Sequence, residues 1–291
     1  MATEHTATQA RPARRAPQPA RRAAGPVLRL TGFLKRSWPS LVSVVALIVV
    51  WQVVVDARHV STFTMPSPSE IWQYIIQNAT SLRQDTQTTL QETLIAYALS
   101  VAIGIPFGLL TYRSRIFARV VYPLLLGSQT FPKVAVGPLF IVWFGFGQLP
   151  IVLLALLLTF FPITLNTVAG LRSVEPESIE LGKIIGLRWY ESIFKIDLPQ
   201  ALPSIFAGLR LATSLAVIGA VVGEFLGTDS GLGYRIVNAT GNADTVELFA
   251  CLVILTVMGL IFYAVVAAIE SILIPWRNRE QDDNSIAQAT L

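Results

Sequence analysis

The sequence predicts an all-α polytopic membrane protein with six transmembrane helices. Of its 291 residues, 53% are hydrophobic and only 14% are charged, whereas soluble domains carry about 25% charged residues. Several long segments contain no charge at all, and a helix needs about 20 largely apolar residues to cross the hydrocarbon core of a bilayer. Most basic residues also fall on one side of the membrane when six spans are threaded through it.

The first span is expected at residues 37–55, which carry no charge. The charge-free segment 134–171 is too long for one span, and GFGQLP at 145–150 supplies a turn that divides it. Two further spans each contain an internal basic residue, Lys133 in one and Arg210 in the other. The six spans are therefore expected at 37–55, 93–112, 119–146, the part of 134–171 after the turn, 200–226 and 248–269.

The distribution of lysine and arginine predicts that both termini are cytoplasmic. Of the 22 basic residues, eight lie in the N-terminal tail, three in 113–119, four in 172–195 and two near the C-terminus. With both termini inside, these seventeen are cytoplasmic, and only Arg58, Arg83 and Arg235 are external. The bias follows the positive-inside rule of membrane proteins.

Both chain ends are expected to be tails outside the permease domain, which covers 37–276. Residues 1–36 lack a periodic apolar pattern, which favours a disordered cytoplasmic tail. Its basic residues suit either contact with anionic membrane lipid or a solvated tail that only fixes the orientation. A cleaved signal peptide is the alternative for the first span, but the five later spans favour a retained anchor. Residues 277–291 are polar and are also expected to be disordered.

The sequence lacks the patterns of common catalytic and metal-binding sites. It contains no G-x-x-x-x-G-K-[ST] phosphate loop, no H-E-x-x-H pair and no G-x-S-x-G turn. Its single cysteine, Cys251, and its two histidines, His5 and His59, are too few for the usual metal sites. We therefore expect no enzyme activity, no metal or cofactor bound by this chain, and no nucleic-acid partner.

One charged segment, ELGKIIGLRWYESIFKIDLP at 180–199, interrupts the apolar pattern on the cytoplasmic side. The region 173–199 predicts a short helix with Pro176 in its first turn. Gly186 is expected to end this helix, because glycine takes the positive φ of a C-terminal cap. A second short helix should follow and stop at Pro199. A short, stiff, charged element of this kind suits contact with a partner protein.

This segment resembles the E-A-A, three residues, G, nine residues, I-x-L-P signature of the permease subunits of ABC importers. The spacing is intact, although Leu181 and Gly182 stand where the signature has two alanines. The matching positions are Glu180, Gly186, Ile196, Leu198 and Pro199.

Three further segments resemble permeases that import nitrate, sulfonates, taurine and thiamine-type pyrimidines. They are PKVAVGPLFIVWFG at 132–145, LPSIFAGLRLA at 202–212 and GEFLGTDSGLGYRI at 223–236. The similarity covers about residues 40–275 of the chain.

The resemblance implies a methionine-importer-type ABC permease fold in which 173–199 forms a cytoplasmic coupling helix. This helix would dock on a separate ATPase dimer, which binds ATP and Mg²⁺, so the missing phosphate loop is expected. Two permease copies would form a homodimer in the bacterial inner (plasma) membrane, and an extracytoplasmic solute-binding protein would deliver the solute. The residues assigned to ATPase coupling are Glu180, Leu181, Gly182, Gly186, Ile196, Leu198 and Pro199.

The expected solute is a pyrimidine, a thiamine precursor or a riboflavin-like heterocycle, because AVIGAVVGEFLG at 216–227 looks most like that branch. The alternatives are a sulfonate, taurine or nitrate importer, or a self-sufficient secondary transporter. A secondary transporter would be expected to show inverted repeats between its halves, which are not evident here.

Lys133, Arg210 and Glu224 are the candidates for the translocation path. Lys133 either faces a cavity or, if the Phe131–Pro132 pair breaks its span, snorkels to the cytoplasmic interface. Arg210 either packs and snorkels or contacts the solute. Glu224 either reaches the outer interface or lines the exit from the binding protein.

Glycines at intervals of four residues predict close helix packing in the membrane. This packing lies either within the chain or between two copies. The glycines are Gly104, Gly108, Gly219, Gly223 and Gly227.

Overall fold

The computed structural model describes residues 26–275, with side chains described from Val42 onward. The chain divides into two units, Met1–Trp51 and Gln52–Leu291, and each is described by itself. Every regular element of the described residues is a helix. In chain order these are α1 (Pro26–Arg58), α2 (Pro68–Gln77), α3 (Ala79–Arg113), α4 (Arg115–Gly127), η1 (Lys133–Val136), α5 (Gly137–Phe144), α6 (Gln148–Arg172), α7 (Pro176–Ile184), α8 (Trp189–Ser192), η2 (Ile193–Asp197), α9 (Leu198–Gly227), α10 (Leu232–Gly241) and α11 (Thr245–Leu273).

The first unit consists, in its described part, of α1 up to Trp51. The predicted first span, 37–55, lies within this helix, but α1 begins already at Pro26. Residues 26–36, which the sequence assigns to a disordered tail, are therefore helical. Proline suits the first turn of a helix, and extending an established helix costs far less than starting one. The predicted tails at 1–25 and 276–291 lie outside the described residues.

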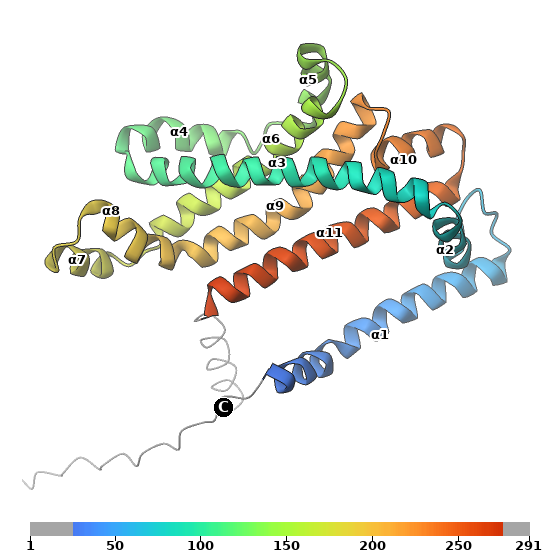
Figure 1. Cartoon of the computed structure of the whole chain (residues 1–291), viewed down its shortest axis with the longest axis horizontal. Coiled ribbons are helices and arrows are strands. Elements are labelled where there is room, and N and C mark those ends of the chain that lie inside the picture. The colour runs from blue at the N-terminus through green and yellow to red at the C-terminus, as the bar shows by residue number, and fades with distance from the viewer. Residues whose placement is uncertain (1–25, 276–291) are drawn as a thin grey trace, which may run out of the picture. The chain divides into compact units, whose positions relative to one another are not determined.

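The second unit is built around four long helices, α3, α6, α9 and α11, which pack side by side (Figure 1). Each is long and apolar enough to cross a membrane, with α9 extended by α8 and η2 at its start. No other helix of the described residues meets these criteria, so the predicted count of six spans is not confirmed. The apolar core lies mainly between α6, α9 and α11, where Ile163, Ile205 and Phe262 are buried.

The predicted third span, 119–146, is broken in the structure. α4 ends at Gly127, and the chain becomes helical again only at Lys133, first as a single 3₁₀ turn and then as α5. Pro132 stands directly before this turn and has no N–H group for a continuous helix. The break at the Phe131–Pro132 pair is therefore confirmed. The turn predicted at 145–150 is also confirmed, with positive φ at Gly145.

A capping box starts α2. The hydroxyl oxygen of Ser67 accepts from the N–H of Glu70 at 3.3 Å, and the Ser67 N–H donates to the Glu70 carboxylate at 2.8 Å. This second bond lowers the pKa of the Glu70 carboxyl, because it stabilises the charged form. Farther along α2, which packs on α11, burial and then the charge of Glu247 raise the pKa of Tyr74.

Glycines allow the backbone of α9 to pack directly against that of α6. A Cβ atom at Gly219 would stand 2.5 Å from the Cα atom of Ala155, and one at Gly223 would stand 2.9 Å from the Cα atom of Ile151. The same close approach to a neighbouring helix occurs at Gly104, Gly108 and Gly227. The predicted small-residue packing is confirmed, and it lies within the chain.

Gly219→Ala is expected to destabilise the protein, because the added methyl group would overlap the backbone of α6. Overpacking of this kind costs about 1–3 kcal/mol. Gly259→Ala is the matched control: this glycine lies inside α11 with no atom within 4 Å of an added Cβ, and the change should stabilise the helix by about 0.5–1 kcal/mol. Thermal unfolding of the purified variants in detergent measures both effects. If Gly219→Ala and the wild-type protein unfold at the same temperature, α6 and α9 can move apart without a loss of stability.

Candidate functional site

The coupling segment, residues 173–199, lies where α6 ends and α9 begins (Figure 1). α7 starts with Pro176 in its first turn, as predicted. It ends before Gly186, whose φ of 78° confirms the predicted glycine cap. The N–H of the next residue, Leu187, donates to the carbonyl of Gly182 at 3.0 Å and closes the turn. The glycine therefore sets the angle between α7 and the helix that follows.

The second helix does not stop at Pro199, contrary to the prediction. α8 passes through one π-helical turn, η2, into α9, so Trp189–Gly227 forms a continuous helix of 39 residues. Pro199 follows directly after this π-helical turn, as the second residue of α9. Single π-helical turns occur inside longer helices, often at functional sites.

Gly182 is one of the two departures from the E-A-A pattern. This residue is buried, and a Cβ atom there would stand 2.7 Å from the Cδ1 atom of Ile196. That atom is the end of a flexible side chain, so the close approach does not by itself require glycine. The contact packs α7 directly onto η2.

The end of α7 exposes a cluster of apolar side chains, which we name the coupling patch: Leu181, Ile184 and Ile185. Their exposed fractions are 58%, 81% and 64%. All three lie outside the helices that are long enough to cross a membrane. Contiguous exposed apolar surface marks a site of contact with another protein or with a membrane surface.

The coupling segment is also tied to α3. The guanidinium group of Arg113, in the last turn of α3, lies over the ring of Trp189 at 5.4 Å from its centroid. A cation over an aromatic face is attracted by the quadrupole of the ring. A displacement of α8 therefore acts on α3 as well as on α9.

At the opposite end of α9, Glu224 is buried, with 1% of its surface exposed. The side chain is therefore enclosed by neighbouring helices of the same chain. One carboxylate oxygen accepts from the hydroxyl of Thr89, and the other accepts from the N–H of Gly233, both at 2.6 Å. A Cβ atom at Gly231 or Gly233 would collide with this carboxylate.

Glu92 of α3 is the partner of Glu224, and it is not among the predicted site residues. It is 2% exposed, and its carboxyl group contacts that of Glu224. The Oε2 atom of Glu92 has no hydrogen-bond partner among the residues that the structure describes. Two carboxylates in contact repel each other, so this buried pair is costly if both groups are ionised.

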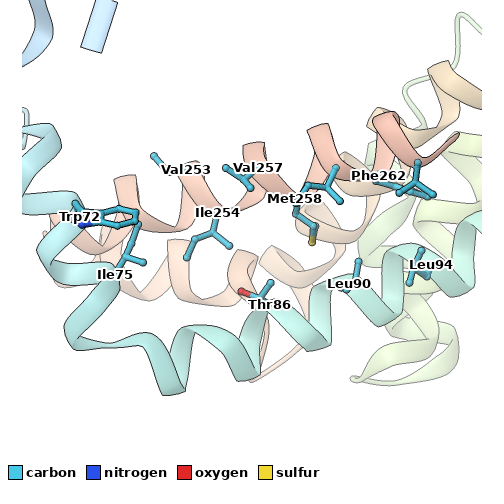
Figure 2. Close-up of a pocket in the computed structure, with 12 residues that line it drawn as sticks. Trp72, Ile75, Thr86, Leu90, Leu94, Val253, Ile254, Val257, Met258 and Phe262 are labelled. Carbon is cyan, nitrogen blue, oxygen red and sulfur yellow. The ribbon is translucent and has the colours of Figure 1, made fainter. Parts of the chain in front are cut away.

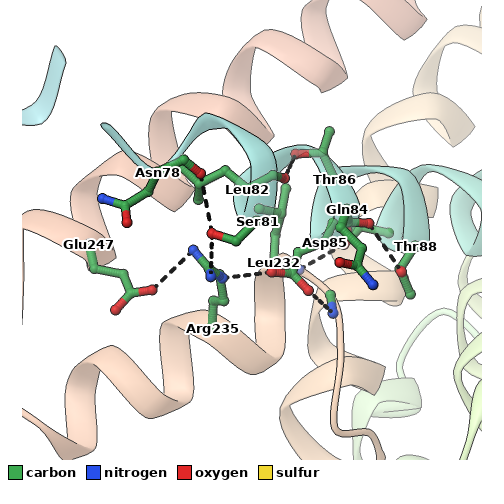
Figure 3. A network of polar contacts seen from close by, with 12 residues as sticks. Asn78, Ser81, Leu82, Gln84, Asp85, Thr86, Thr88, Leu232, Arg235 and Glu247 are labelled. Atoms are coloured by element: carbon green, nitrogen blue, oxygen red, sulfur yellow. Dashed lines mark hydrogen bonds and ion pairs between the residues drawn. The ribbon is translucent and has the colours of Figure 1, made fainter. Parts of the chain in front are cut away.

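Arg235 of α10 connects this cluster to its surroundings (Figure 3). Its Nε atom lies 2.6 Å from the carboxylate of Asp85, and it donates through Nη2 to the hydroxyl of Ser81 at 3.0 Å. Its Nη1 atom lies 3.3 Å from the carboxylate of Glu247. Asp85 in turn accepts from the N–H of Gly231 at 3.1 Å. The network therefore joins α3, α9, α10 and α11 at the end of α9 that lies away from the coupling segment.

Arg210 pairs with an acid of a neighbouring helix. Its Nε atom lies 3.2 Å from the Oε2 atom of Glu270 on α11. The pair neutralises the charge of the fifth predicted span where water is scarce. This supports the packing alternative for Arg210.

Lys133 lies at the start of η1, with its ammonium nitrogen 4.9 Å from the ring centroid of Phe161. It lines a cavity of about 280 Å³ beside α6 and α9. The three predicted path residues are not brought together: Lys133 faces this cavity, Arg210 faces α11 and Glu224 faces α3 and α10.

A larger groove of about 500 Å³ lies between α2, α3 and α11 (Figure 2). Its lining is almost entirely apolar, and the hydroxyl of Thr86 already donates to the carbonyl of Leu82. The groove therefore suits hydrocarbon chains, and it has too few free polar groups to bind a polar solute.

Comparison with known proteins identifies the family. The family of binding-protein-dependent transport system inner membrane components matches residues 100–279, which include the whole coupling segment. The chain belongs to this family.

Two curated relatives align with most of the sequence of this permease. The formylaminopyrimidine transport permease protein ThiX of Halalkalibacterium halodurans is 38% identical over 252 residues, which is 85% of this chain and 100% of the relative. A putative aliphatic sulfonates transport permease protein, SsuC of Bacillus subtilis, is 34% identical over 80% of this chain and 85% of its own length. Both are transport permeases, which confirms that the chain is a permease subunit and not an enzyme.

A solved structure confirms the fold. A chain of the MetNI methionine ABC transporter in an inward-facing conformation superposes with a TM-score of 0.60 and 19% sequence identity. The match covers 67% of this permease and 97% of that chain. The expected methionine-importer-type permease fold is therefore correct.

Glu92→Gln is expected to preserve the fold, whereas Glu224→Gln should destabilise it. A glutamine at 92 removes one of two carboxyl groups in contact, and its amide can donate to the Glu224 carboxylate. A glutamine at 224 would turn a donor toward either Thr89 or Gly233, and each buried group left without its partner costs about 1–3 kcal/mol. Thermal unfolding in detergent compares the two variants. A larger loss for Glu92→Gln would show that Glu92 contributes more to stability than the hydrogen bonds of Glu224.

Proposed function

We propose that this permease subunit imports a small heterocycle, best represented by a substituted pyrimidine, with energy from ATP hydrolysed on a separate subunit. The observation that carries the coupling part of this proposal is the coupling patch. Apolar side chains are exposed to water on a helix that leads directly into a membrane span. An apolar ridge of this kind fits a groove on a soluble partner.

The proposed partners follow from the same segment and from the family. An ATPase dimer would receive one coupling segment from each of two identical permease chains, and it would bind ATP with Mg²⁺. A solute-binding protein would deliver the solute at the opposite face, where α10 and the Arg235 network lie. Of the seven coupling residues predicted from the sequence, Glu180, Leu181 and Gly186 are exposed for such contact, while Gly182 is buried.

The continuous helix from Trp189 to Gly227 supports a mechanical link between the two faces. It begins in the coupling segment and ends beside the Glu224 network. A movement that the ATPase imposes on α7 would reach the outer ends of α3 and α10 through this helix. Such coupling requires that nucleotide and solute each favour one conformation over the other.

The proposed solute rests on similarity along the whole chain. The formylaminopyrimidine permease matches over its full length with 38% identity, slightly more than the 34% of the sulfonate permease. A sulfonate is therefore the second candidate. Because the binding protein selects the solute in binding-protein-dependent systems, the permease constrains this choice only weakly.

We also propose that both termini are cytoplasmic, as the positive-inside pattern predicts. Two exposed positions test this orientation, Ser61 before α2 and Glu177 in α7. In a Cys251→Ala background, Ser61→Cys should react with an impermeant thiol reagent in intact cells, and Glu177→Cys should react only after permeabilisation. The reverse pattern would invert the topology.

The function is tested with the purified complex. The permease is co-expressed with its candidate ATPase and reconstituted with the candidate binding protein. Formylaminopyrimidine should stimulate ATP hydrolysis and be taken up, while taurine should do neither. Stimulation by taurine alone would move the chain to the sulfonate branch, and uptake by the permease without an ATPase would refute the importer.

Gly186→Val is expected to uncouple ATP hydrolysis from uptake. Valine at a φ of 78° is strained by about 1–2 kcal/mol, and relief of this strain would tilt α7 and the coupling patch. Gly145→Val is the matched control, with a φ of 80° in the turn between α5 and α6. Uptake, ATPase binding and expression are compared for both. If the two variants lose uptake equally, the loss reflects strain in general and not the orientation of α7.

A further inference from the structure

The cavity that contains Lys133 lies midway across the membrane part of the permease. It is bounded by the break before η1, by α6 and by α9, and its lining includes Gln129, Phe161, Asn166 and Leu211. At 1.5 Å per residue, Phe161 lies about 20 Å from the start of α6 and about 17 Å from its end. The cavity is therefore near the middle of that span.

Lys133 carries a charge without a carboxylate partner in this region. Its ammonium group lies over the ring of Phe161, and no ion pair joins it to any acid whose side chain the structure describes. Arg210, the other basic residue within a predicted span, is neutralised by Glu270. Ionisable groups at this depth are costly, and where they occur they face a cavity or a pathway. The uncompensated charge thus points to a polar occupant.

The backbone beside the cavity supports the same conclusion. Between α4 and η1 the chain is not helical, with turns from Ser128 to Phe131. Irregular backbone is tolerated at membrane depth only where it is buried in protein or lines a water-filled cavity. Broken helices of this kind form solute sites in membrane transporters.

Two amide side chains complete the polar lining. Asn166 donates through Nδ2 to the carbonyl of Pro162 at 2.8 Å, so its carbonyl oxygen remains as an acceptor. Gly208 fixes its position, since a Cβ atom there would stand 2.6 Å from the Cβ of Asn166. Gln129 adds a second amide from the irregular segment. The cavity therefore offers one cation, two amides and an aromatic ring.

We propose that this cavity is a solute subsite on the translocation path, in which Lys133 binds a hydrogen-bond-accepting oxygen or ring nitrogen of a planar solute. The inference rests on the proposed import function and narrows its solute class. A volume of about 280 Å³ lies just below the range of drug-sized ligand pockets, which is roughly 300–1,000 Å³. This size suits a single substituted ring rather than a three-ring flavin. The ammonium group leaves the Phe161 ring for the solute and returns when the solute departs.

The first test compares uptake of formylaminopyrimidine by the reconstituted complex. Lys133→Met keeps the length and apolar stem of the side chain but removes its charge. It should raise the KM for uptake about tenfold, the effect expected for one lost charge-assisted hydrogen bond. Lys133→Arg should retain most of the uptake. Arg83→Met is the control, because it removes the same charge at the exposed outer end of α3.

The second test measures access to the cavity. In a Cys251→Ala background, Lys133→Cys should react with a cationic methanethiosulfonate reagent in vesicles, because the cavity lies on an aqueous path. The subsite is overturned if Lys133→Met leaves uptake unchanged or lowers it only as much as Arg83→Met does. It is also overturned if the cysteine at position 133 fails to react. If the wild-type complex imports taurine instead of the pyrimidine, the proposed solute is wrong. Taurine uptake by Lys133→Met and Arg83→Met then decides whether the cavity is a solute subsite.

Discussion

The close contact between α6 and α9 supports every functional part of this permease. Glycines on α9 let its backbone approach that of α6 directly, with Gly219 against Ala155 and Gly223 against Ile151. In a bilayer, close packing of this kind replaces the hydrophobic effect as the force between helices. The two helices are joined at one end by the coupling segment, enclose the Lys133 cavity along their length, and present Glu224 at the other end. A shift of either helix would therefore change all three.

The membrane environment explains how the charges within the spans are arranged. Arg210 is matched by Glu270, so this pair limits the uncompensated charge within the spans. Arg235 likewise lies between two acids, Asp85 and Glu247. Lys133 differs because its ammonium group lies over the ring of Phe161, and no ion pair joins it to an acid whose side chain the structure describes. That difference separates a group available to a solute from groups that hold the helices together.

The coupling segment combines rigidity with an exposed apolar surface. Gly186 sets the direction of α7, the contact between Gly182 and Ile196 fixes α7 on η2, and Arg113 holds Trp189 from the side. The π-helical turn then carries the chain past Pro199 without a break. In the proposed importer, a rigid element of this kind transmits displacement, whereas a flexible loop would absorb it. The exposed coupling patch supplies the contact through which a soluble partner could act.

The sequence by itself determined the membrane class, the long spans in α3, α6, α9 and α11, the glycine cap at Gly186 and the turn at Gly145. These features depend on local composition, hydropathy and backbone preference, all of which are visible in a short window. The tertiary structure alone decided that Glu224 is buried against Glu92, that Arg210 pairs with Glu270 and that Lys133 faces a cavity. Glu92 gives no local signal because it stands at the edge of a charge-free segment, where an acid usually marks the membrane surface. The partners of a charged residue lie on other helices, more than a hundred residues away in the case of Glu224, so burial and pairing are fixed only when the helices pack.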